Sequence, residues 1–314
     1  MANCNNLFKE FNKSISVDAD KNSKMTNSKT ALRDKIRKWF RENHPDYVPK
    51  FYIQGSYKMK TGIRTKEDIC DLDDGVYFFR QPDVSATTLH GWIYQAVNGH
   101  TNSSPEHRKK CIRTIFVSDY EVDHPVYYKI EGEDYQIAVK NTGFESSDPK
   151  AMVDWFNSNK DKNGVLISMV KYLKVWCDNI RNQMPSGLAM TILAINAQKN
   201  IVLNERDDIT LKDILKEIRS TLNPNFECIV PAVPNDDLFE NYDTDRRNLF
   251  LKALDDFIDD AENALKEENE LASSKYWKKH LGERFPAGKN EKQIISTRAA
   301  AAAIGASTSF PWAR

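Results

Sequence analysis

The segment IQGSYKMKTGIRTKEDICDLDDGVYFF, residues 53–79, places acidic side chains inside a pattern that otherwise predicts a buried strand. Asp71 and Asp73 are two positions apart, so on a strand their side chains project from one face, about 7 Å from each other. Two carboxylates held side by side repel, and one is driven toward protonation unless a cation lies between them. The pattern therefore predicts a divalent cation site. Mg²⁺ suits it because this ion combines one or two carboxylates with phosphate oxygens.

A Gly-Ser pair lies upstream of the acidic strand. Gly55 and Ser56 follow the predicted strand KFYIQ. A glycine-containing turn that leads into a helix can point backbone N–H groups at an anion. The segment as a whole therefore predicts a triphosphate held by Gly55 and Ser56, next to a metal held by Asp71 and Asp73.

Simpler interpretations of this segment also exist. A D-x-D pair or a Gly-Ser pair alone is common in surface turns and then has no function. An EF-hand calcium loop is the specific alternative for DLDDG, but it fails on spacing. Counted from Asp71, Gly75 falls at the fifth position, where an oxygen ligand belongs, and Pro82 falls at the twelfth, where a bidentate Glu belongs.

The composition is that of an ordinary globular protein. The chain has 314 residues, of which 40% are hydrophobic and 29% are charged, which is enough for one large domain or two lobes. Its 45 Lys and Arg residues balance 45 Asp and Glu residues, so the net charge is +0. No overall positive field attracts duplex DNA, and any phosphate site must be local.

The cysteines and the apolar segments bear on cellular location. Cys4, Cys70, Cys111, Cys177 and Cys228 are odd in number and lack C-x-x-C spacing, which disfavours a disulfide framework and a structural zinc site. No secretory leader pattern is evident, and the longest run of small apolar residues is too short to span a bilayer. We expect a soluble, cytoplasmic protein without membrane contact.

The first half of the chain predicts a strand-rich lobe over roughly residues 51–139. A polar piece, DADKNSKMTNS, is expected to be mobile, and a helix is expected to begin at Ser28 or Thr30. Residues 117–130 predict one strand that returns as a hairpin through YQIAVK.

The second half changes to helical periodicity. Helices are predicted for KAMVDWFNSN, GVLISMVKYLKVWCDNIRNQ, SGLAMTILAINAQK and TLKDILKEIRSTLN, with Ser186 as a plausible cap. A long amphipathic helix over residues 243–270 is predicted to bury a stripe containing Leu249, Ala253, Phe257 and Ala261. A weakly structured tail follows.

Several ordered motifs together resemble one family. GSYKMKT followed by DLDDGVYF resembles the signature of the polymerase β nucleotidyltransferase superfamily, and YEVDHPVYYK, SMVKYLKVWCDN, MPSGLAMTIL and YWKKHLGERFP extend the likeness over most of the chain. Within the superfamily the chain resembles the cGAS/DncV-like nucleotidyltransferases, bacterial synthases of antiphage signalling. The resemblance implies a bilobed α+β fold with a mixed sheet. It also implies a core lobe with an N-terminal helix over residues 1–145, a helical lobe over 146–286 and a tail over 287–314.

The resemblance also assigns metal-binding roles. Asp71 and Asp73 would bind both metals, and a third carboxylate would complete the catalytic set. Asp119, Glu121 and Asp123 share strand parity, so periodicity cannot choose among them. The match VDHPVY selects Asp123. Asp74 points to the opposite face, as a supporting or surface residue, and His124 is expected to be structural.

Nucleotide-binding roles follow in the same way. Lys171 and Lys174 lie on one helical side, so either could reach a triphosphate, and the resemblance of LKVW favours Lys174. Further expected contacts are phosphate or ribose for Lys129, the donor nucleotide for Ser186, the base for Gln54 and Tyr57, and the triphosphate for Gly55 and Ser56. A helix cap explains Ser186 equally well.

The resemblance implies phosphoryl transfer with two Mg²⁺ ions, or Mn²⁺, acting on ATP, GTP or other nucleoside triphosphates. The expected product is a cyclic dinucleotide of the cyclic GMP-AMP type, read by a downstream effector, with an accessory regulator acting on the C-terminal tail. One alternative is a linear oligonucleotide synthase or a toxin-like transferase that modifies RNA or protein. A second is an inactive nucleotide-binding scaffold.

Overall fold

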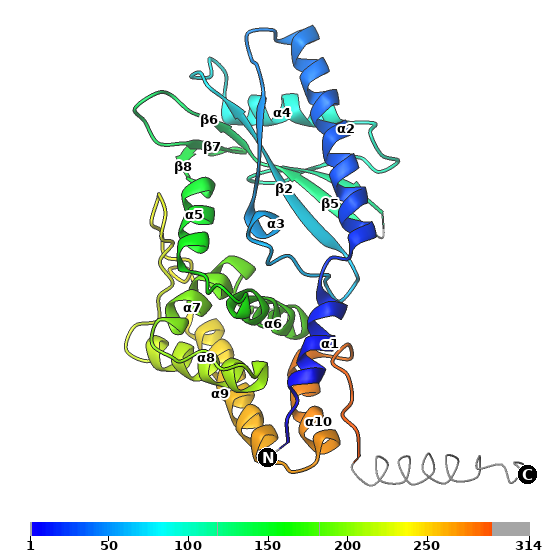
Figure 1. The fold of residues 1–314 in the computed structure, drawn as a ribbon. Coiled ribbons are helices and arrows are strands. Elements are labelled where there is room, and N and C mark those ends of the chain that lie inside the picture. The colour runs from blue at the N-terminus through cyan, green and yellow to red at the C-terminus, as the bar shows by residue number, and fades with distance from the viewer. Residues whose placement is uncertain (1, 118, 182, 291–314) are drawn as a thin grey trace, which may run out of the picture.

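The chain folds into two lobes stacked along the long axis of the molecule (Figure 1). The structure is a computed structural model, and it describes residues 2–117, 119–181 and 183–290. A sheet lobe lies at the top of the figure and a helical lobe at the bottom, which confirms the predicted bilobed α+β fold. The C-terminal segment GASTSFPWAR, expected to be accessible to a regulator, lies outside the described residues.

One mixed sheet organises the upper lobe. In the described part of the chain, eight strands pair in the order β3-β4-β5-β2-β6-β7-β8, with β1 joined to β2. Their bounds are β1 (Lys50–Gln54), β2 (Cys70–Phe78), β3 (Glu106–His107), β4 (Ile112–Phe116), β5 (Tyr120–His124), β6 (Val126–Tyr128), β7 (Gln136–Val139) and β8 (Gly143–Ser146). The helices of this lobe are α2 (Ala19–Asn43), α3 (Gly55–Met59) and α4 (Ala86–Val97). Strand β2 is central because it pairs antiparallel with β1 and parallel with β5 and β6.

The predicted strand over residues 117–130 is interrupted in the structure. Pro125 separates β5 from β6, and the two short strands pair with successive parts of β2. A proline has no N–H to donate to a ladder, although the carbonyl oxygen of Pro125 still accepts from Val76 N at 2.8 Å. The predicted hairpin is present, because β6 pairs antiparallel with β7.

Helix α2 corrects the interpretation of the N-terminal region. The segment expected to be mobile is helical, and the helix begins at Ala19 and not at Ser28 or Thr30. Asp18 is the N-cap, and its side chain accepts from Lys21 N at 2.8 Å. Met25 and Leu32 are fully buried against the sheet-lobe core, so packing holds this polar sequence in a helix.

Helices form the lower lobe around an aromatic core. They are α1 (Asn5–Ile15), α5 (Pro149–Asn159), α6 (Val165–Ile180), α7 (Gly187–Gln198), α8 (Asp207–Leu222), α9 (Thr244–Lys266) and α10 (Glu270–Leu281). Ser186 caps α7 as predicted, with its hydroxyl accepting from Ala189 N at 3.2 Å. The predicted stripe of α9 is wrong by one position at its start: Leu249 is 42% exposed, and Phe250 is buried instead.

Helix α1 packs in the lower lobe although it precedes the sheet lobe in the chain. The Phe8 ring lies 5.2 Å from that of Tyr172 and 5.0 Å from those of Trp277 and Phe285. A division of the chain at residue 145 therefore does not account for α1, which packs against α6, α8 and the rings of Trp277 and Phe285. Sequence periodicity cannot reveal this, because LFKEF shows that a face is apolar but not which lobe covers it.

Phe8 gives a direct test of this packing. We expect Phe8→Ala to lower the free energy of unfolding by about 3–5 kcal/mol, because the ring is fully buried among aromatic neighbours. Denaturant unfolding followed by tryptophan fluorescence measures the change. Phe79→Ala is the matched control, because Phe79 is 51% exposed and its removal should change stability by roughly 0.5 kcal/mol or less. Equal losses for the two variants would contradict the assignment of α1 to the lower core.

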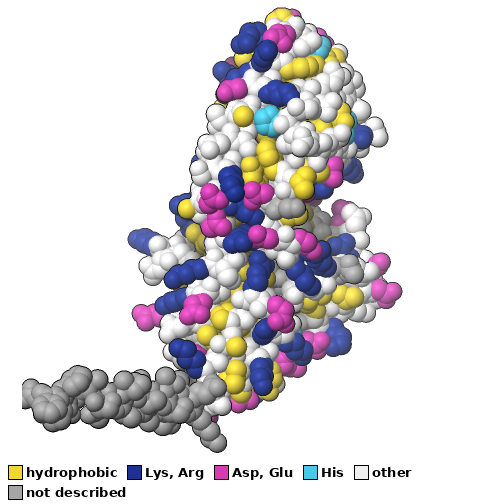
Figure 2. All heavy atoms as spheres, turned by 90° about the vertical axis from the view of Figure 1, so that its right-hand side faces the viewer, with side chains coloured by type: hydrophobic (Ala, Val, Ile, Leu, Met, Phe, Trp, Pro, Cys, Tyr) yellow, Lys and Arg dark blue, Asp and Glu magenta, His cyan; other side chains and the backbone are white. Residues whose placement is uncertain are grey.

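The surface is mixed in charge. On the face drawn in Figure 2, acidic and basic side chains of the described residues are interspersed over both lobes, in line with the net charge of +0. In the described part of the chain, no helix combines the length and the apolar character that crossing a bilayer requires.

Candidate active site

A cavity of about 810 Å³ lies between the two lobes. The sheet lobe contributes Gly55 and Ser56 of α3 and Asp71 and Asp73 of β2, and the helical lobe contributes residues of α6, α7 and the loop between them. This volume is in the range of pockets that bury most of a small-molecule ligand. The acidic strand and the Gly-Ser turn, which the sequence predicts to act together, therefore line one cavity.

The three carboxylates lie on two neighbouring parallel strands. Asp73 of β2 is directly paired with Asp123 of β5, while Asp71 is paired with Glu121. Asp71 is exposed, Asp73 is half-buried and Asp123 is buried. Burial, together with the negative charges of Asp71 and Asp123, raises the pKa of Asp73 to about 8. Carboxylate oxygens with such an excess of negative charge are the ligands that a hard divalent cation prefers.

Asp123 is engaged by an arginine. Arg113 of β4 donates from Nε and from one terminal nitrogen to the two carboxylate oxygens of Asp123, both at 2.7 Å. The described residues contain no group of three His, Cys, Asp or Glu side chains already placed to hold a metal ion. Asp71 and Asp73 fit a cation as they stand, whereas Asp123 would have to exchange its contact with Arg113 to join them.

The other two acids of the same strand segment face different partners. Asp119 lies 3.3 Å from Lys21 Nζ, and Glu121 forms an ion pair with Arg113. Asp123 is the member of this set whose negative charge helps to raise the pKa of Asp73.

Asp74 is completely buried and paired with Arg33, with 2.8 Å between Nε and a carboxylate oxygen, so a surface location for it is wrong. The His124 ring nitrogen lies 3.0 Å from the Asp74 carbonyl oxygen, which matches a structural role.

Gly55 is required by the close approach of α3 to β2. Its φ is 60°, in the left-handed region, and an added Cβ would lie 2.0 Å from Asp73 Oδ2. The start of α3 therefore sits directly against the acidic strand. Only glycine allows this approach.

Lys174 of α6 faces the carboxylates from the opposite lobe. Its Nζ donates to the carbonyl and hydroxyl oxygens of Thr61 at 3.2 and 3.3 Å. Burial lowers the pKa of Lys174 to about 8, although the charges of Asp71 and Asp73 oppose this shift. A polyphosphate in the cavity adds negative charge and would favour the protonated amine.

Five residues with predicted nucleotide contacts do not line this cavity: Gln54, Tyr57, Lys129, Lys171 and Ser186. Two of them hydrogen-bond to side chains of the protein. The Gln54 amide donates to Tyr127 Oη at 3.0 Å and accepts from Tyr77 Oη at 2.7 Å, while Lys171 Nζ donates to Ser16 Oγ at 2.9 Å.

The other three also contact protein groups. Tyr57 hydrogen-bonds to Asn22, Lys129 donates to the Glu133 carbonyl oxygen, and the Ser186 hydroxyl caps α7. Nucleotide contacts for these five side chains stay predictions, since none of the five lines this cavity.

The last turn of α6 and the residues after it supply part of the cavity wall that the sequence analysis did not predict. Asp178, Arg181 and Gln183 all line the cavity, together with Thr65 from the loop before β2. Arg181 forms an ion pair with Glu67, and Asp178 accepts from the backbone N–H of Lys66, so the two lobes touch at this edge. The segment WCDNIRNQ showed only helical periodicity, and nothing in it indicated a cavity.

The sequence is similar to a known protein family and to curated proteins of that kind. A family model described as the nucleotidyltransferase domain of cyclic GMP-AMP synthase DncV-like proteins matches residues 49–127. A cyclic GMP-AMP synthase of Escherichia albertii is 30% identical over 228 residues, covering 65% of this chain and 49% of that protein. A cyclic GMP-AMP synthase of Vibrio cholerae is 23% identical over 230 residues, covering 55% of this chain and 53% of that protein. The matches thus span about half the length of these two relatives.

Solved structures agree with the fold. The crystal structure of Vibrio cholerae DncV bound to GTP has a TM-score of 0.80 at 16% identity, covering 90% of this chain and 96% of that chain. Escherichia coli DncV bound to 3′-deoxy GTP has a TM-score of 0.75 at 18% identity, covering 87% of this chain and 93% of that chain.

The fold and the paired acids define the class first: the chain has the architecture of a polymerase β-like nucleotidyltransferase. The family match over residues 49–127 and the curated relatives then narrow the comparison. In this part the chain is similar to the nucleotidyltransferase domain of DncV-like cyclic GMP-AMP synthases, the resemblance that its sequence motifs predicted.

The charge cluster makes a prediction for the metal-free protein. The pKa of Asp73 rises from 3.8 to about 8 on folding, so stability that is fully present below pH 4 is lost as the pH rises through 8. Asparagine carries no charge at any pH. In EDTA, Asp73→Asn should therefore raise the melting temperature at pH 9 by about 2–4 °C, which corresponds to about 1 kcal/mol in a domain of this size.

At pH 5 the same substitution should have a smaller effect, because Asp73 is then protonated in the folded protein. Asp34→Asn is the control, since that side chain is 66% exposed and lies on α2, outside the cavity. Scanning calorimetry at the two pH values measures both variants. An equal change for Asp73→Asn at pH 5 and pH 9 would contradict the raised pKa.

Proposed function

We propose that this chain condenses two ribonucleoside triphosphates, ATP and GTP, into a cyclic dinucleotide of the cyclic GMP-AMP type. The observation that carries the proposal is one cavity in which Asp71 and Asp73 face Lys174 and the Gly55–Ser56 turn. The sheet lobe thus supplies the acids for metal ions and the Gly-Ser turn for a triphosphate, and the helical lobe supplies Lys174, around a space of nucleotide size.

Each residue has a proposed part in the chemistry. Asp71 and Asp73, joined by Asp123, would hold two Mg²⁺ or Mn²⁺ ions, which lower the pKa of an acceptor hydroxyl and neutralise the departing pyrophosphate. The backbone and hydroxyl of Ser56 would contact the triphosphate, and Lys174 would add positive charge to it. The oxygen of a ribose hydroxyl would then form a bond to the α-phosphorus of the donor nucleotide, while the bond from that phosphorus to the departing pyrophosphate breaks. No covalent enzyme intermediate is needed.

Two successive transfers would close the ring. The first joins the nucleotides into a linear dinucleotide that keeps its 5′-triphosphate, and the second uses that triphosphate after the intermediate turns round in the cavity. A structure of Vibrio cholerae DncV holds the linear intermediate 5′-pppA(3′,5′)pG, which supports this order by analogy. In the cell the product would act as a second messenger of antiphage defence through a downstream effector. An accessory regulator would act on the C-terminal tail.

The test is product identification. Purified chain with Mg²⁺, ATP and GTP is expected to give a phosphatase-resistant product whose mass matches a cyclic dinucleotide. Radiolabel in RNA or protein would favour a toxin-like transferase, and phosphatase-sensitive oligomers would favour a linear synthase. Nucleotide binding without turnover would favour a scaffold. Each of these results would overturn the proposal.

A further inference from the structure

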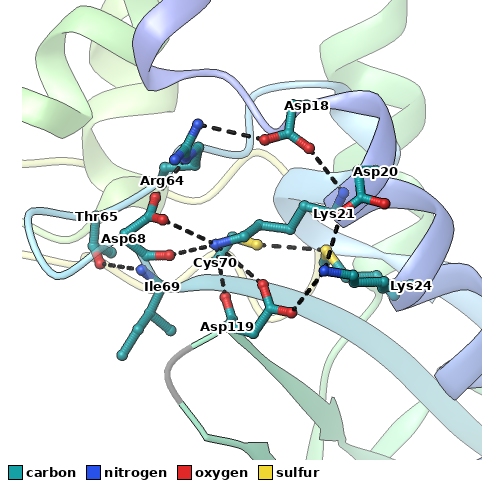
Figure 3. A network of polar contacts seen from close by, with 11 residues as sticks. Asp18, Asp20, Lys21, Lys24, Arg64, Thr65, Asp68, Ile69, Cys70 and Asp119 are labelled. Carbon is teal, nitrogen blue, oxygen red and sulfur yellow. Dashed lines mark hydrogen bonds and ion pairs between the residues drawn. The ribbon is translucent and has the colours of Figure 1, made fainter.

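Lys21 is a buried lysine outside the cavity. It lies on the first turn of α2 and is 7% exposed. Figure 3 shows its amine between Asp68 and Asp119. Nζ donates to the Asp68 carbonyl oxygen at 2.5 Å and to the Asp119 carbonyl oxygen at 3.0 Å. It also lies 3.5 and 3.3 Å from their carboxylates. Burying an ammonium group is costly unless it is paired and hydrogen-bonded, and both conditions are met here.

The two partners of Lys21 stand immediately before the two acidic strands. Asp68 precedes β2, which carries Asp71 and Asp73, and Asp119 precedes β5, which carries Asp123. The two strands run parallel and are in register from Cys70 opposite Tyr120 onward. A single ammonium group therefore ties together the starts of both strands.

The connection is rigid on the β2 side. Residues 65–69 form a tight turn in which Ile69 N donates to Thr65 Oγ1 at 3.1 Å and Asp68 N donates to the Thr65 carbonyl oxygen at 2.9 Å. Arg64 pairs with the Asp68 carboxylate and also lies 3.5 Å from Asp18, the N-cap of α2. Figure 3 shows Arg64, Asp68 and Asp18 next to Lys21. A shift at Lys21 would thus pass directly into β2.

Loss of the ammonium group would do more than remove two hydrogen bonds. The carboxylates of Asp68 and Asp119 share this one buried cation. Arg64 would still pair with Asp68, and Lys24 with Asp119, but of these three cations it is Lys21 that lies near both carboxylates, so they would repel each other more strongly without it. Their repulsion would push the starts of β2 and β5 apart. Asp73 and Asp123 lie opposite each other a few residues further along the same pair of strands.

We propose that Lys21 is a positioning residue that sets the separation of Asp71 and Asp73 from Asp123, and thereby the affinity of the cluster for divalent ions. This inference rests on the proposed function, because it assumes that these three acids bind metal. Lys21 contacts neither the cavity nor the reacting atoms, and acts only through the two strands.

The experiment measures Mn²⁺ binding directly. Electron paramagnetic resonance gives the Mn²⁺ affinity in the presence of a non-hydrolysable GTP analogue, well below the melting temperature of each variant. Lys21→Met keeps the aliphatic stem but loses the charge, and we expect it to weaken Mn²⁺ binding by about 10–100-fold, the usual effect of removing a group that orients metal ligands. The Mg²⁺ concentration for half-maximal activity should rise in parallel, with a smaller change in the KM for nucleotide.

Two further variants separate positioning from general damage. Lys21→Arg keeps the positive charge and should recover most of the Mn²⁺ affinity. Lys38→Met removes an exposed lysine from the same helix and should bind as the wild type does. Adding Asp68→Asn and Asp119→Asn to Lys21→Met removes the repulsion between the two carboxylates, and this triple variant should bind Mn²⁺ better than Lys21→Met alone.

The outcomes distinguish this inference from the proposed function. If the wild type binds Mn²⁺ and forms product while Lys21→Met binds Mn²⁺ equally well, only the role of Lys21 is overturned. If the wild type neither binds Mn²⁺ nor forms product, the proposed function fails and the inference fails with it. Should Lys21→Met not fold, Asp119→Asn carries the test, because it removes one of the two carboxylate partners. Weaker Mn²⁺ binding by that variant supports the inference, and unchanged binding overturns it.

Discussion

Changing Asp71 and Asp73 together to asparagine is expected to lower the rate of product formation by roughly 10³-fold or more, the upper range for loss of a group that stabilises transition-state charge. Asparagine keeps the size of the side chain but removes the negative charge that attracts metal ions. The folded protein should be at least as stable as the wild type, because burial and mutual repulsion already raise the pKa of Asp73 to about 8. Chromatography of the products against time measures the rate.

Asp20→Asn is the matched control for this pair. Asp20 is an acidic side chain 79% exposed on α2, away from the cavity, and its loss should leave the rate unchanged. A double variant that unfolds would not count as support, so circular dichroism accompanies each assay. Full activity of a folded Asp71→Asn, Asp73→Asn protein would exclude these carboxylates from the chemistry.

Gly55→Ala should also lower activity, for a steric reason. The new Cβ would lie 2.0 Å from Asp73 Oδ2, so the carboxylate or the start of α3 must move. A displacement of about 1 Å in a catalytic group typically costs about 10²-fold in rate. We expect a loss of about 10²-fold in kcat/KM with ATP and GTP, measured by pyrophosphate release.

The chain offers a close control for backbone strain. Gly99 has a φ of 67°, compared with 60° for Gly55, and a Cβ at Gly99 meets no atom within 4 Å. Gly99→Ala therefore introduces the same left-handed alanine, at about 1–2 kcal/mol, without touching the cavity. If both alanine variants keep wild-type activity, the contact between Gly55 and Asp73 does not matter for catalysis.

Local chemistry made the center of the site predictable from sequence. Asp71, Asp73, Gly55 and Ser56 lie within one short segment whose strand and turn patterns dictate which side chains share a face. The parity rule also left Asp123 among three candidates. The structure places Asp123 opposite Asp73, a pairing that depends on how β5 aligns with β2.

Contacts between segments far apart in the sequence determine the partners of several side chains, and sequence patterns do not reveal such contacts. Lys171 and Lys174 share a helical side, yet one reaches Ser16 and the other Thr61, because two different segments pack against α6. Likewise, Gln54 precedes the Gly-Ser turn, but two tyrosines from neighbouring strands bind its amide. The ring of contacts around Lys21 joins α2 to two turns that are far apart in sequence, and no periodicity indicates it.

The most direct measurement of the central claim is a crystal structure with Mn²⁺ and a non-hydrolysable GTP analogue, using anomalous scattering to locate the ions. We predict manganese bound to the carboxylates of Asp71 and Asp73, with Asp123 released from Arg113 and the triphosphate running from the metals toward Ser56 and Lys174. A triphosphate bound elsewhere, or manganese without contact to Asp71 and Asp73, would contradict the account.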